Sequence, residues 1–526
     1  MSKKIIRHQE ENTTLRTDEL RKIVNVYVFL ILVIFPLFFT NFYYNILKSK
    51  YLFFCVTSIG CAVILLVYSL YKGIPVLPRR LDIKDLWRGF SFPDKSLIIF
   101  YVCLIISTIS SDFKSQAFWG NEGRLTGLFY YSIVLIIYFI VTRLYRFNEK
   151  VLNIAMGVGV LACLFGITDY CKMDLLHFKA ELSSRQKSIY VSTFGNINTY
   201  TVYVGIVLAM AVILFATAKC WQRAAFYYVC SIVFMFALIM GQSDNAYLSL
   251  AAILGFSPLY LFRDRRGIRR YGITVASFFT VVQCVDYINQ TFPQHVYGIK
   301  GVFNIIANLS FLHILVIALW IAAALLWVIC RGDGPVSKIW RFVWLGLLIL
   351  CAVALVFALC DVNLAGNGEK YGRLKKYLLF RDSWGTNRGF VWRISLEMFG
   401  GFSVFRKLFG FGPETFGILT NMHYYNEMVK VYQQIYDSAH NEYLQFLVTV
   451  GIAGLASYLS FMLSSVVRMV KRGVEKPHVM AVVMAIAAYM TQAIVNINVP
   501  VVAPFLLMLL MVALSECRSE TDAQRQ

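Results

Sequence analysis

Long apolar runs recur along the whole chain, and they constrain its fold more than any other feature. A helix that crosses the hydrocarbon core of a bilayer needs about 20 mostly apolar residues. Hydrophobic residues make up 58% of the 526 residues and charged residues only 15%, and the runs are continuous, which excludes the alternating strands of an outer-membrane barrel. We therefore expect an all-α polytopic membrane protein with about fourteen transmembrane helices (twelve to fourteen). The runs lie approximately at 23–40, 51–71, 96–110, 125–142, 151–170, 199–218, 224–241, 246–262, 271–290, 308–330, 342–361, 442–465, 478–496 and 499–515.

Lysine and arginine are distributed unevenly between the loops, and this predicts the orientation of the helices. Cytoplasmic loops carry an excess of these residues. With the N-terminus in the cytoplasm, the inner segments hold 31 of the 50 Lys and Arg, and the short outer loops hold 9. We therefore expect cytoplasmic tails at 1–22 and 516–526. The formal net charge of +21 then reflects topology beside anionic lipid, and the chain has no module that would indicate nucleic-acid binding.

A large polar segment divides the chain into a helix bundle over 23–361, an outer loop over 362–441 and closing helices over 442–515. Long loops in compact proteins are usually functional or disordered. This loop is not of low complexity, and the spacing of its apolar residues predicts two short helices, at 389–400 and 426–436. We therefore expect a partly helical extracytoplasmic loop that folds as a cap on the outer membrane surface.

The segment DSAHNEYLQFLVTVGIAGL places His440 where the outer loop enters a membrane helix. A histidine at this boundary can be tuned to accept a proton near neutral pH. Asp437 could orient its ring or hold its charge, and Asn441 could hydrogen-bond a polar ligand. An interfacial histidine that merely reaches into water is the alternative interpretation.

Arginines occur in a second segment, NRGFVWR followed by FGFGPETFG, which contains Arg388, Arg393 and Glu414. The planar guanidinium matches phosphate oxygens in a forked contact. The glycine pair Gly410 and Gly412 allows a tight backbone approach, but no GK[ST] follows, so this is not a phosphate-binding loop of the Walker type.

Three further segments fall on the same outer side. Arg124, in FWGNEGRLTGLFYY, lies at the outer end of a predicted helix, and Asn196, in STFGNINTY, lies at the outer end of another. Asp244 lies in the tight outer turn GQSDNAY between two predicted helices. Because all of these segments converge on one face, we expect a single outward-facing site that combines cations with a candidate base. Such a site suits a diphosphate-linked substrate held at the outer leaflet.

These motifs resemble the O-antigen ligase / O-antigen polymerase superfamily of bacterial polytopic membrane glycosyltransferases, over roughly residues 115–460. The resemblance implies a metal-independent enzyme without a cofactor, in the bacterial cytoplasmic membrane. Its donor would be a glycan on a polyprenyl diphosphate such as undecaprenyl diphosphate, and its acceptor a glycan, lipid or protein. The resemblance assigns His440 as the base or acceptor-positioning group and Arg388 as the ligand of the diphosphate.

The candidate substrate-binding residues are Arg124, Arg393, Asn441, Asp437, Asn196 and Glu414. Asp244 stands where ligases of the family carry an arginine, so Arg124 or Arg393 would have to supply the second cation. Polymerase, ligase and protein O-oligosaccharyltransferase activities all stay open. A polysaccharide flippase is the alternative from another class, but polarity concentrated at one face favours the enzyme.

Overall fold

The computed structural model describes residues 18–74 and 82–518, and helices make up almost all the regular structure of this part of the chain. Eleven of the described helices are long and apolar enough to cross a membrane, and three shorter apolar helices accompany them. Each of these fourteen helices overlaps one of the predicted runs, so the predicted all-α multi-pass membrane fold is confirmed. Most of the two predicted tails, 1–22 and 516–526, lies outside the described residues.

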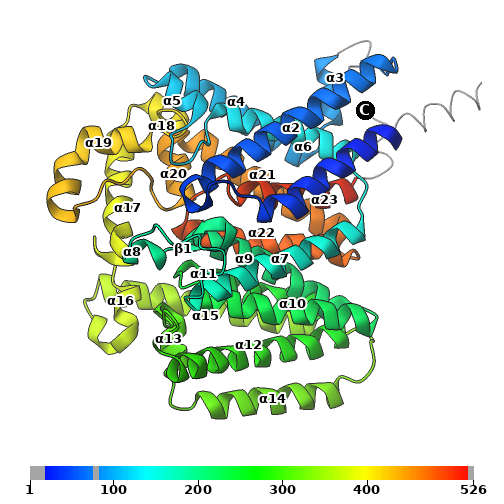
Figure 1. The fold of residues 1–526 in the computed structure, drawn as a ribbon, viewed down its shortest axis with the longest axis vertical. Coiled ribbons are helices and arrows are strands. Elements are labelled where there is room, and N and C mark those ends of the chain that lie inside the picture. The colour runs from blue at the N-terminus through cyan, green and yellow to red at the C-terminus, as the bar shows by residue number, and fades with distance from the viewer. Residues whose placement is uncertain (1–17, 75–81, 519–526) are drawn as a thin grey trace, which may run out of the picture.

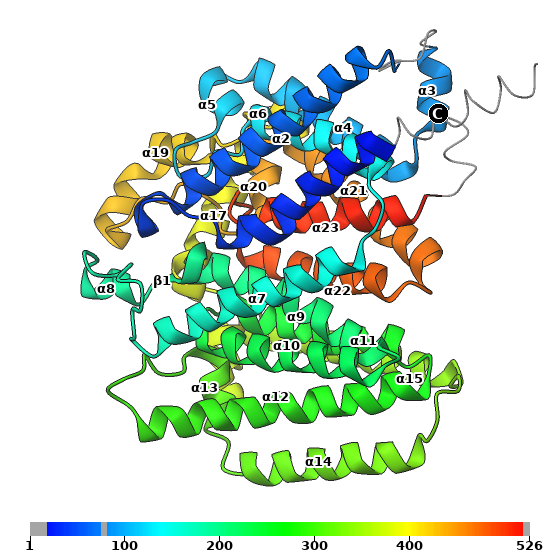
Figure 2. The ribbon, with the colours of Figure 1, turned by 45° about the vertical axis from the view of Figure 1, so that its right-hand side comes forward.

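The long helices pack side by side around a central one. The fourteen are Asp18–Leu37, α2 (Ile46–Tyr71), α4 (Phe92–Ser110), α6 (Leu128–Leu144), α7 (Glu149–Tyr170), α9 (Ile197–Thr217), α10 (Trp221–Met240), α11 (Asn245–Leu261), α12 (Arg265–Thr291), α14 (Leu312–Ile329), α15 (Ile339–Asn363), α21 (Gly451–Gly473), α22 (Pro477–Gln492) and α23 (Ala503–Glu516). They lie across the view in Figure 1, from α2 and α4 at the top to α12 and α14 at the bottom, and Figure 2 shows the same order after rotation. The apolar helix α9 packs against α10 and α22, and nearly all of its side chains are buried, as expected of a helix that is hydrophobic all round.

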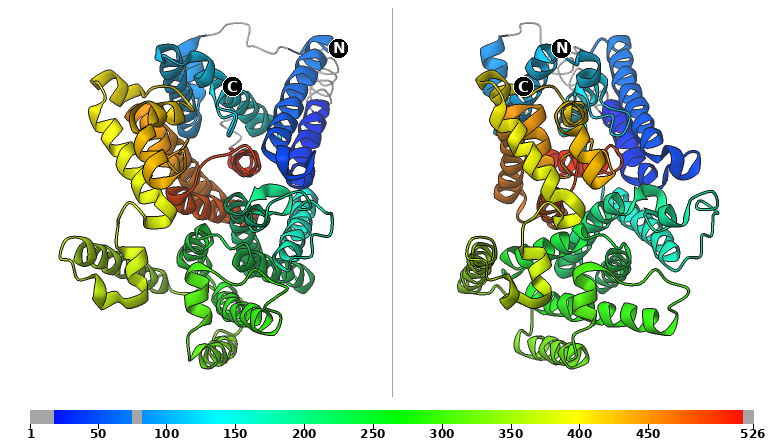
Figure 3. Two further views of the ribbon diagram at one scale, coloured as in Figure 1. Left: turned by 60° about the vertical axis from the view of Figure 1, so that its left-hand side comes forward. Right: turned by 90° about the vertical axis from the view of Figure 1, so that its left-hand side faces the viewer.

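The short elements gather at one end of this stack, which we call the loop end. They are α5 (Lys114–Trp119), α8 (Ser184–Lys187), the hairpin of β1 (Tyr190–Val191) and β2 (Gly195–Asn196), α13 (Gly301–Ala307), α16 (Lys375–Leu378), α17 (Trp384–Gly401), α18 (Val404–Phe409) and α19 (Phe416–Glu427). They lie at the left of Figure 1, and Figure 3 turns this end toward the viewer. α3 (Ile83–Gly89) lies at the opposite end. The polar segments recognised in the sequence therefore meet at the loop end.

Arginines of the basic segment 263–270 cap helices at the opposite end. Arg270 donates hydrogen bonds of 2.6 Å to the carbonyl oxygens of Phe215 and Ala218, where α9 ends. Arg269 donates to the carbonyl oxygen of Cys330, just after α14. The C-terminal carbonyls of a helix carry partial negative charge, which these cations stabilise. The basic segment 263–270 therefore closes helix ends.

Residues 384–441, which we call the cap, contain a small hydrophobic core of their own. The predicted helix 389–400 lies within α17, and the predicted apolar stripe of Val391, Ile394 and Met398 is buried in this core. Side chains of α19 and of α20 (Glu442–Thr449) complete it. The core fastens the cap to the start of the closing helices.

The second predicted helix of the cap, 426–436, is wrong in its bounds. α19 and the π-helical turn Met428–Tyr432 cover residues 416–432 instead. The chain leaves the helix at Gln433, whose φ is +49°, and the Ile435 side chain is 50% exposed. Apolar spacing alone could not locate this end, because the left-handed residue that ends the helix is a glutamine with no sequence signal of its own.

The predicted helix 442–465 is two helices, α20 and α21, which meet at Gly451. Gly451 has φ +76°, and a side chain there would overlap the backbone of Leu408. Gly410, with φ +70°, lies equally close to the backbone of Thr449. The glycine pair of FGFGPETFG therefore packs α18 against this break, and the Gly412 N–H donates to the Thr449 carbonyl at 2.9 Å.

Candidate active site

His440 lies at the junction between the cap and α20. Its neighbour Asn441 caps this helix, because the Asn441 Oδ1 atom accepts hydrogen bonds from the N–H groups of Tyr443 and Leu444 at 3.0 and 3.1 Å. Asparagine is among the preferred N-cap residues. His440 has φ +45°, a left-handed conformation that is uncommon for residues other than glycine and is concentrated at functional sites. The His440 backbone is thus held just outside the start of α20.

Glu442 anchors this helix to the membrane bundle. Its carboxylate accepts hydrogen bonds from the hydroxyl groups of Tyr458 on α21 and Tyr489 on α22, at 2.5 and 2.7 Å. All three side chains are buried. The anchor lies two residues beyond His440 and restrains its position, and the sequence motif alone did not identify this role.

The His440 ring forms no hydrogen bond or ion pair with any residue that the structure describes. Burial lowers the pKa of His440 to about 4, and the positive charges of Arg388 and Arg124 lower it further, while Asp437 opposes them. The imidazole is therefore neutral at pH 7, with a ring nitrogen able to accept a proton. Two guanidinium groups from distant parts of the chain therefore act on the His440 ring through their charge.

Arg388 follows a strained turn at the start of α17. Gly385, Thr386 and Asn387 have φ values of 59°, 59° and 69°, and a β-branched residue such as threonine is rare in this region. The Arg388 guanidinium donates one hydrogen bond, to the Gly385 carbonyl at 3.1 Å, and its buried Nε atom has no partner. Burial lowers the pKa of Arg388, and within the described chain it forms no ion pair. Such a guanidinium has donors free to bind an anion.

Arg388 lines a cavity of about 510 Å³ at the loop end. Three more cations, Lys300, Lys376 and Arg381, line the same cavity, and Asp244 is its one carboxylate among the described residues. Sequence reasoning did not select these three cations. The signal for them was weak, because each is an isolated basic residue in a different part of the chain.

Asp244, where an arginine was expected, faces Arg388 across this cavity. Its negative charge raises the pKa of Arg388 in opposition to burial, and its carboxylate lies against Gly301 at the start of α13. The cavity therefore has a carboxylate at position 244, but Lys300, Lys376 and Arg381 keep it net positive.

Arg124 is buried in a cluster that holds the segment before His440. Its guanidinium donates to the Asp437 carbonyl oxygen at 2.9 Å and to Asp437 Oδ1 at 2.6 Å. Glu414 Oε2 lies 3.7 Å away, and Glu414 Oε1 accepts a hydrogen bond from Thr126 at 2.5 Å. Only 4% of the Arg124 side chain is exposed. The structure thus brings three of the predicted substrate-binding residues together, bound to one another.

Arg393 lies on α17 among three carboxylates. It contacts Asp382 at 3.0 Å, Glu397 at 3.0 Å and Glu427 at 2.7 Å. These ion pairs join α17 to α19 and balance the charge of the guanidinium. Arg393 therefore stabilises the fold of the cap.

Asn196 caps α9. Its Oδ1 atom accepts a hydrogen bond from the Asn198 N–H at 2.8 Å, and Asn198 in turn accepts one from Ser243 at 2.6 Å. Asn196 thus helps to order the turn that precedes Asp244, and the contacts of its side chain are local to the helix start.

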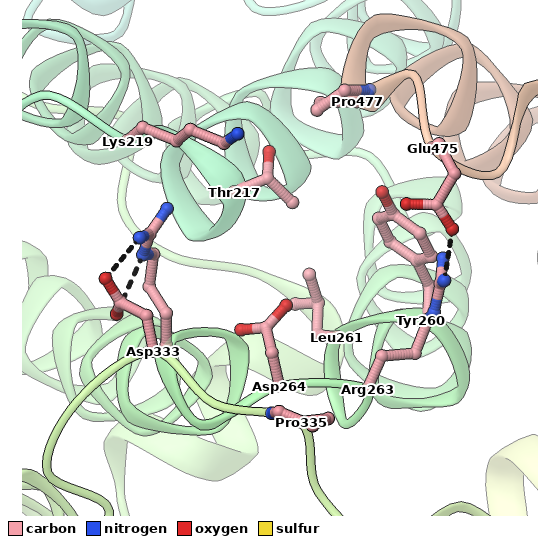
Figure 4. A pocket seen from close by; sticks show the side chains of 11 residues that line it. Thr217, Lys219, Tyr260, Leu261, Arg263, Asp264, Asp333, Pro335, Glu475 and Pro477 are labelled. Atoms are coloured by element: carbon pink, nitrogen blue, oxygen red, sulfur yellow. Dashed lines mark hydrogen bonds and ion pairs between the residues drawn. The ribbon is translucent and has the colours of Figure 1, made fainter.

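A second cavity, of about 410 Å³, lies at the opposite end of the bundle and differs in its charge balance. Its arginines pair with carboxylates: Arg266 pairs with Asp333, and Arg263 pairs with Glu475, as Figure 4 shows for the second pair. Ion pairs of this kind leave little positive charge for a ligand. The unpaired Arg388 therefore marks the loop-end cavity as the better anion site.

The fold and the site together define a multi-pass membrane protein with a cationic cavity and an adjacent histidine at one end of its helices. A family model described as O-antigen ligase matches residues 296–459, a little under a third of the chain. The match covers Arg388, His440 and most of the residues that line the loop-end cavity, and it supports the resemblance to the O-antigen ligase / O-antigen polymerase superfamily. No curated protein matches the chain.

Proposed function

We propose that this chain is a glycosyltransferase that transfers or polymerises glycan from a polyprenyl-diphosphate donor, at the outer face of the bacterial cytoplasmic membrane. One observation supports the proposal most strongly. The half-buried Arg388 and His440, neither of which forms an ion pair with a described residue, lie at the loop end, and Arg388 lines a cavity together with further cations. The family match supports glycosyltransferase chemistry of this general kind.

Arg388 has the chemistry to bind the diphosphate. A guanidinium makes forked contacts with phosphate oxygens, and its partial desolvation strengthens them. As the bond between the anomeric carbon and the diphosphate oxygen breaks, the leaving polyprenyl diphosphate keeps the electron pair. Arg388 would stabilise the charge that develops there.

His440 is suited to take the proton of the acceptor hydroxyl as its oxygen bonds to the anomeric carbon. In the free protein its pKa of about 4 makes it a weak base. Burial is the main cause of this low pKa, and the charges of Arg388 and Arg124 add to it. An anion bound at Arg388 would offset one of these two charges and raise the pKa, so the histidine would be a stronger base when the donor is bound.

The excess of Lys and Arg in the predicted inner segments supports an outward-facing loop end with both termini in the cytoplasm. A Lys430→Cys variant tests this orientation, because Lys430 is exposed on the cap. We expect a membrane-impermeant maleimide to label it in intact cells above the wild-type background. Labelling only after lysis would reverse the orientation.

The function can be tested by deleting the gene from its host and measuring envelope glycan length and attachment. We expect wild-type protein and the control His423→Ala, at an exposed histidine of α19, to restore the glycan, and His440→Ala to fail. Full rescue by His440→Ala would refute the catalytic proposal. Lost glycan with normal flipping of the lipid-linked donor would exclude a flippase, and loss confined to glycoproteins would indicate protein O-glycosylation.

A further inference from the structure

Two cavities at the loop end form one continuous groove. The cavity beside Arg388 adjoins a second one of about 530 Å³, and both are lined by Gly301 and Lys376. The second cavity extends along α13, where Asn304 and Asn308 line it, to Arg373. The groove therefore includes a second cavity that Arg388 does not line.

The groove contains five cations, and none of them forms an ion pair with a described residue. They are Lys300, Arg373, Lys376, Arg381 and Arg388. Neighbouring basic residues behave differently: Lys375 pairs with Glu369, and Arg393 has its three carboxylates.

Two acidic residues close in sequence to the groove cations are engaged elsewhere. Asp361 accepts hydrogen bonds from Asn367 and Tyr371, and Asp382 binds Arg393. Asp244 is the one carboxylate that lines the groove among the described residues. The fold thus concentrates uncompensated positive charge along this path.

We infer that the part of the groove beyond Arg388 binds an acidic glycan, with Arg373 and Lys376 contacting its carboxylate or phosphate groups. This inference rests on the proposed function, in which the diphosphate of the donor occupies the Arg388 end. A diphosphate diester carries about two negative charges, which leaves the more distant cations without a partner. The amides of Asn304 and Asn308 can hydrogen-bond sugar hydroxyls, and Tyr377 and Trp384 offer rings for stacking against a sugar face.

The test measures binding, not transfer, so it separates this inference from the proposed function. Purified full-length protein in phosphatidylcholine nanodiscs is titrated with an oligogalacturonate hexamer and with a neutral maltohexaose. We expect the acidic hexamer to bind at least tenfold more tightly and to weaken steeply with added salt. Equal affinity for the two sugars would overturn the inference even if the protein transfers glycan normally.

Matched variants locate the site. Arg373→Gln with Lys376→Gln should weaken oligogalacturonate binding at least tenfold, whereas Arg406→Gln with Lys430→Gln, outside the groove, should change it less than twofold. Repeating the titration in phosphatidylglycerol nanodiscs distinguishes an anionic lipid headgroup as the occupant. Oligogalacturonate binding that is unchanged in the groove variants would refute an acidic glycan as the occupant. So would a complete loss of oligogalacturonate binding in phosphatidylglycerol nanodiscs, if the wild type retains phosphatidylglycerol and the groove variants do not.

Discussion

Removing the Arg124 side chain should loosen the segment that carries His440. The Arg124 guanidinium bonds both the backbone and the side chain of Asp437, three residues before His440, and lies 3.7 Å from buried Glu414. Arg124→Ala would leave Glu414 in the protein interior with only Thr126 as its side-chain hydrogen-bond partner.

The size of the effect follows from burial. Breaking a buried ion pair by removing one partner costs about 3–5 kcal/mol, because the remaining charge is stranded. The Asp437 side chain is 55% exposed, so its ion pair adds only about 0–1 kcal/mol. We therefore expect a local destabilisation of about 3–5 kcal/mol, equivalent to a factor of about 100 or more in the opening equilibrium.

Hydrogen–deuterium exchange of peptides covering 434–441 measures this opening directly. Exchange there should accelerate about 100-fold or more in Arg124→Ala, and Arg124→Ala combined with Glu414→Gln should recover part of the loss. Burial already raises the pKa of Glu414, and losing Arg124 would raise it further, so the Arg124→Ala defect should shrink as the pH falls. The control Arg223→Ala removes an exposed pair with Glu149 and should change stability by about 1 kcal/mol or less.

Unchanged exchange together with lost donor binding would contradict this reasoning. In that case Arg124 would bind substrate directly, as the sequence motif suggested, and its contacts with Asp437 and Glu414 would give way when the donor arrives.

The other predictions concern pH and backbone packing. Because burial and then Arg388 lower the pKa of His440, the acid limb of kcat/KM should lie near pH 4 in the wild type and at higher pH in the residual activity of Arg388→Gln. The depressed pKa should also make the fold lose stability as the pH falls from about 6.5 to about 4, because over this range the unfolded chain takes up a proton that the buried His440 does not. This loss should be absent in His440→Ala, as thermal unfolding at several pH values would reveal. Gly410→Ala should lower Tm, since φ is +70° and the new methyl overlaps the Thr449 backbone at a cost of about 1–3 kcal/mol or more, whereas Gly400→Ala, in open space, should not. An unchanged Tm for Gly410→Ala would show that this junction can move.

Hydrophobicity predicted the membrane helices because each helix depends on a local run of apolar residues. The break at Gly451 was not predictable in this way, since it depends on the approach of Leu408 from a different helix. The glycine itself gave no warning inside an otherwise apolar segment.

The candidate site was predictable in its location but not in its internal contacts. The motifs correctly placed the polar segments at one end of the bundle. The partners of Arg124, however, are about 300 residues away in sequence, at Glu414 and Asp437, and no pattern of spacing encodes such a pair. Lys300 and Lys376 were missed for the same reason, because only the fold brings them to the cavity of Arg388.

Transfer in a purified system tests the central claim most directly. Proteoliposomes with a synthetic polyprenyl-diphosphate glycan and an excess of glycan acceptor would be followed for labelled product and for donor affinity. We expect His440→Ala to bind the donor about as well as the wild type but to lose at least 100-fold in transfer rate, in line with the usual contribution of a general base. Arg388→Lys should instead weaken donor binding, because a point charge cannot make the forked contact. Transfer by His440→Ala within twofold of the wild-type rate, at saturating donor, would contradict the assignment of this site as catalytic.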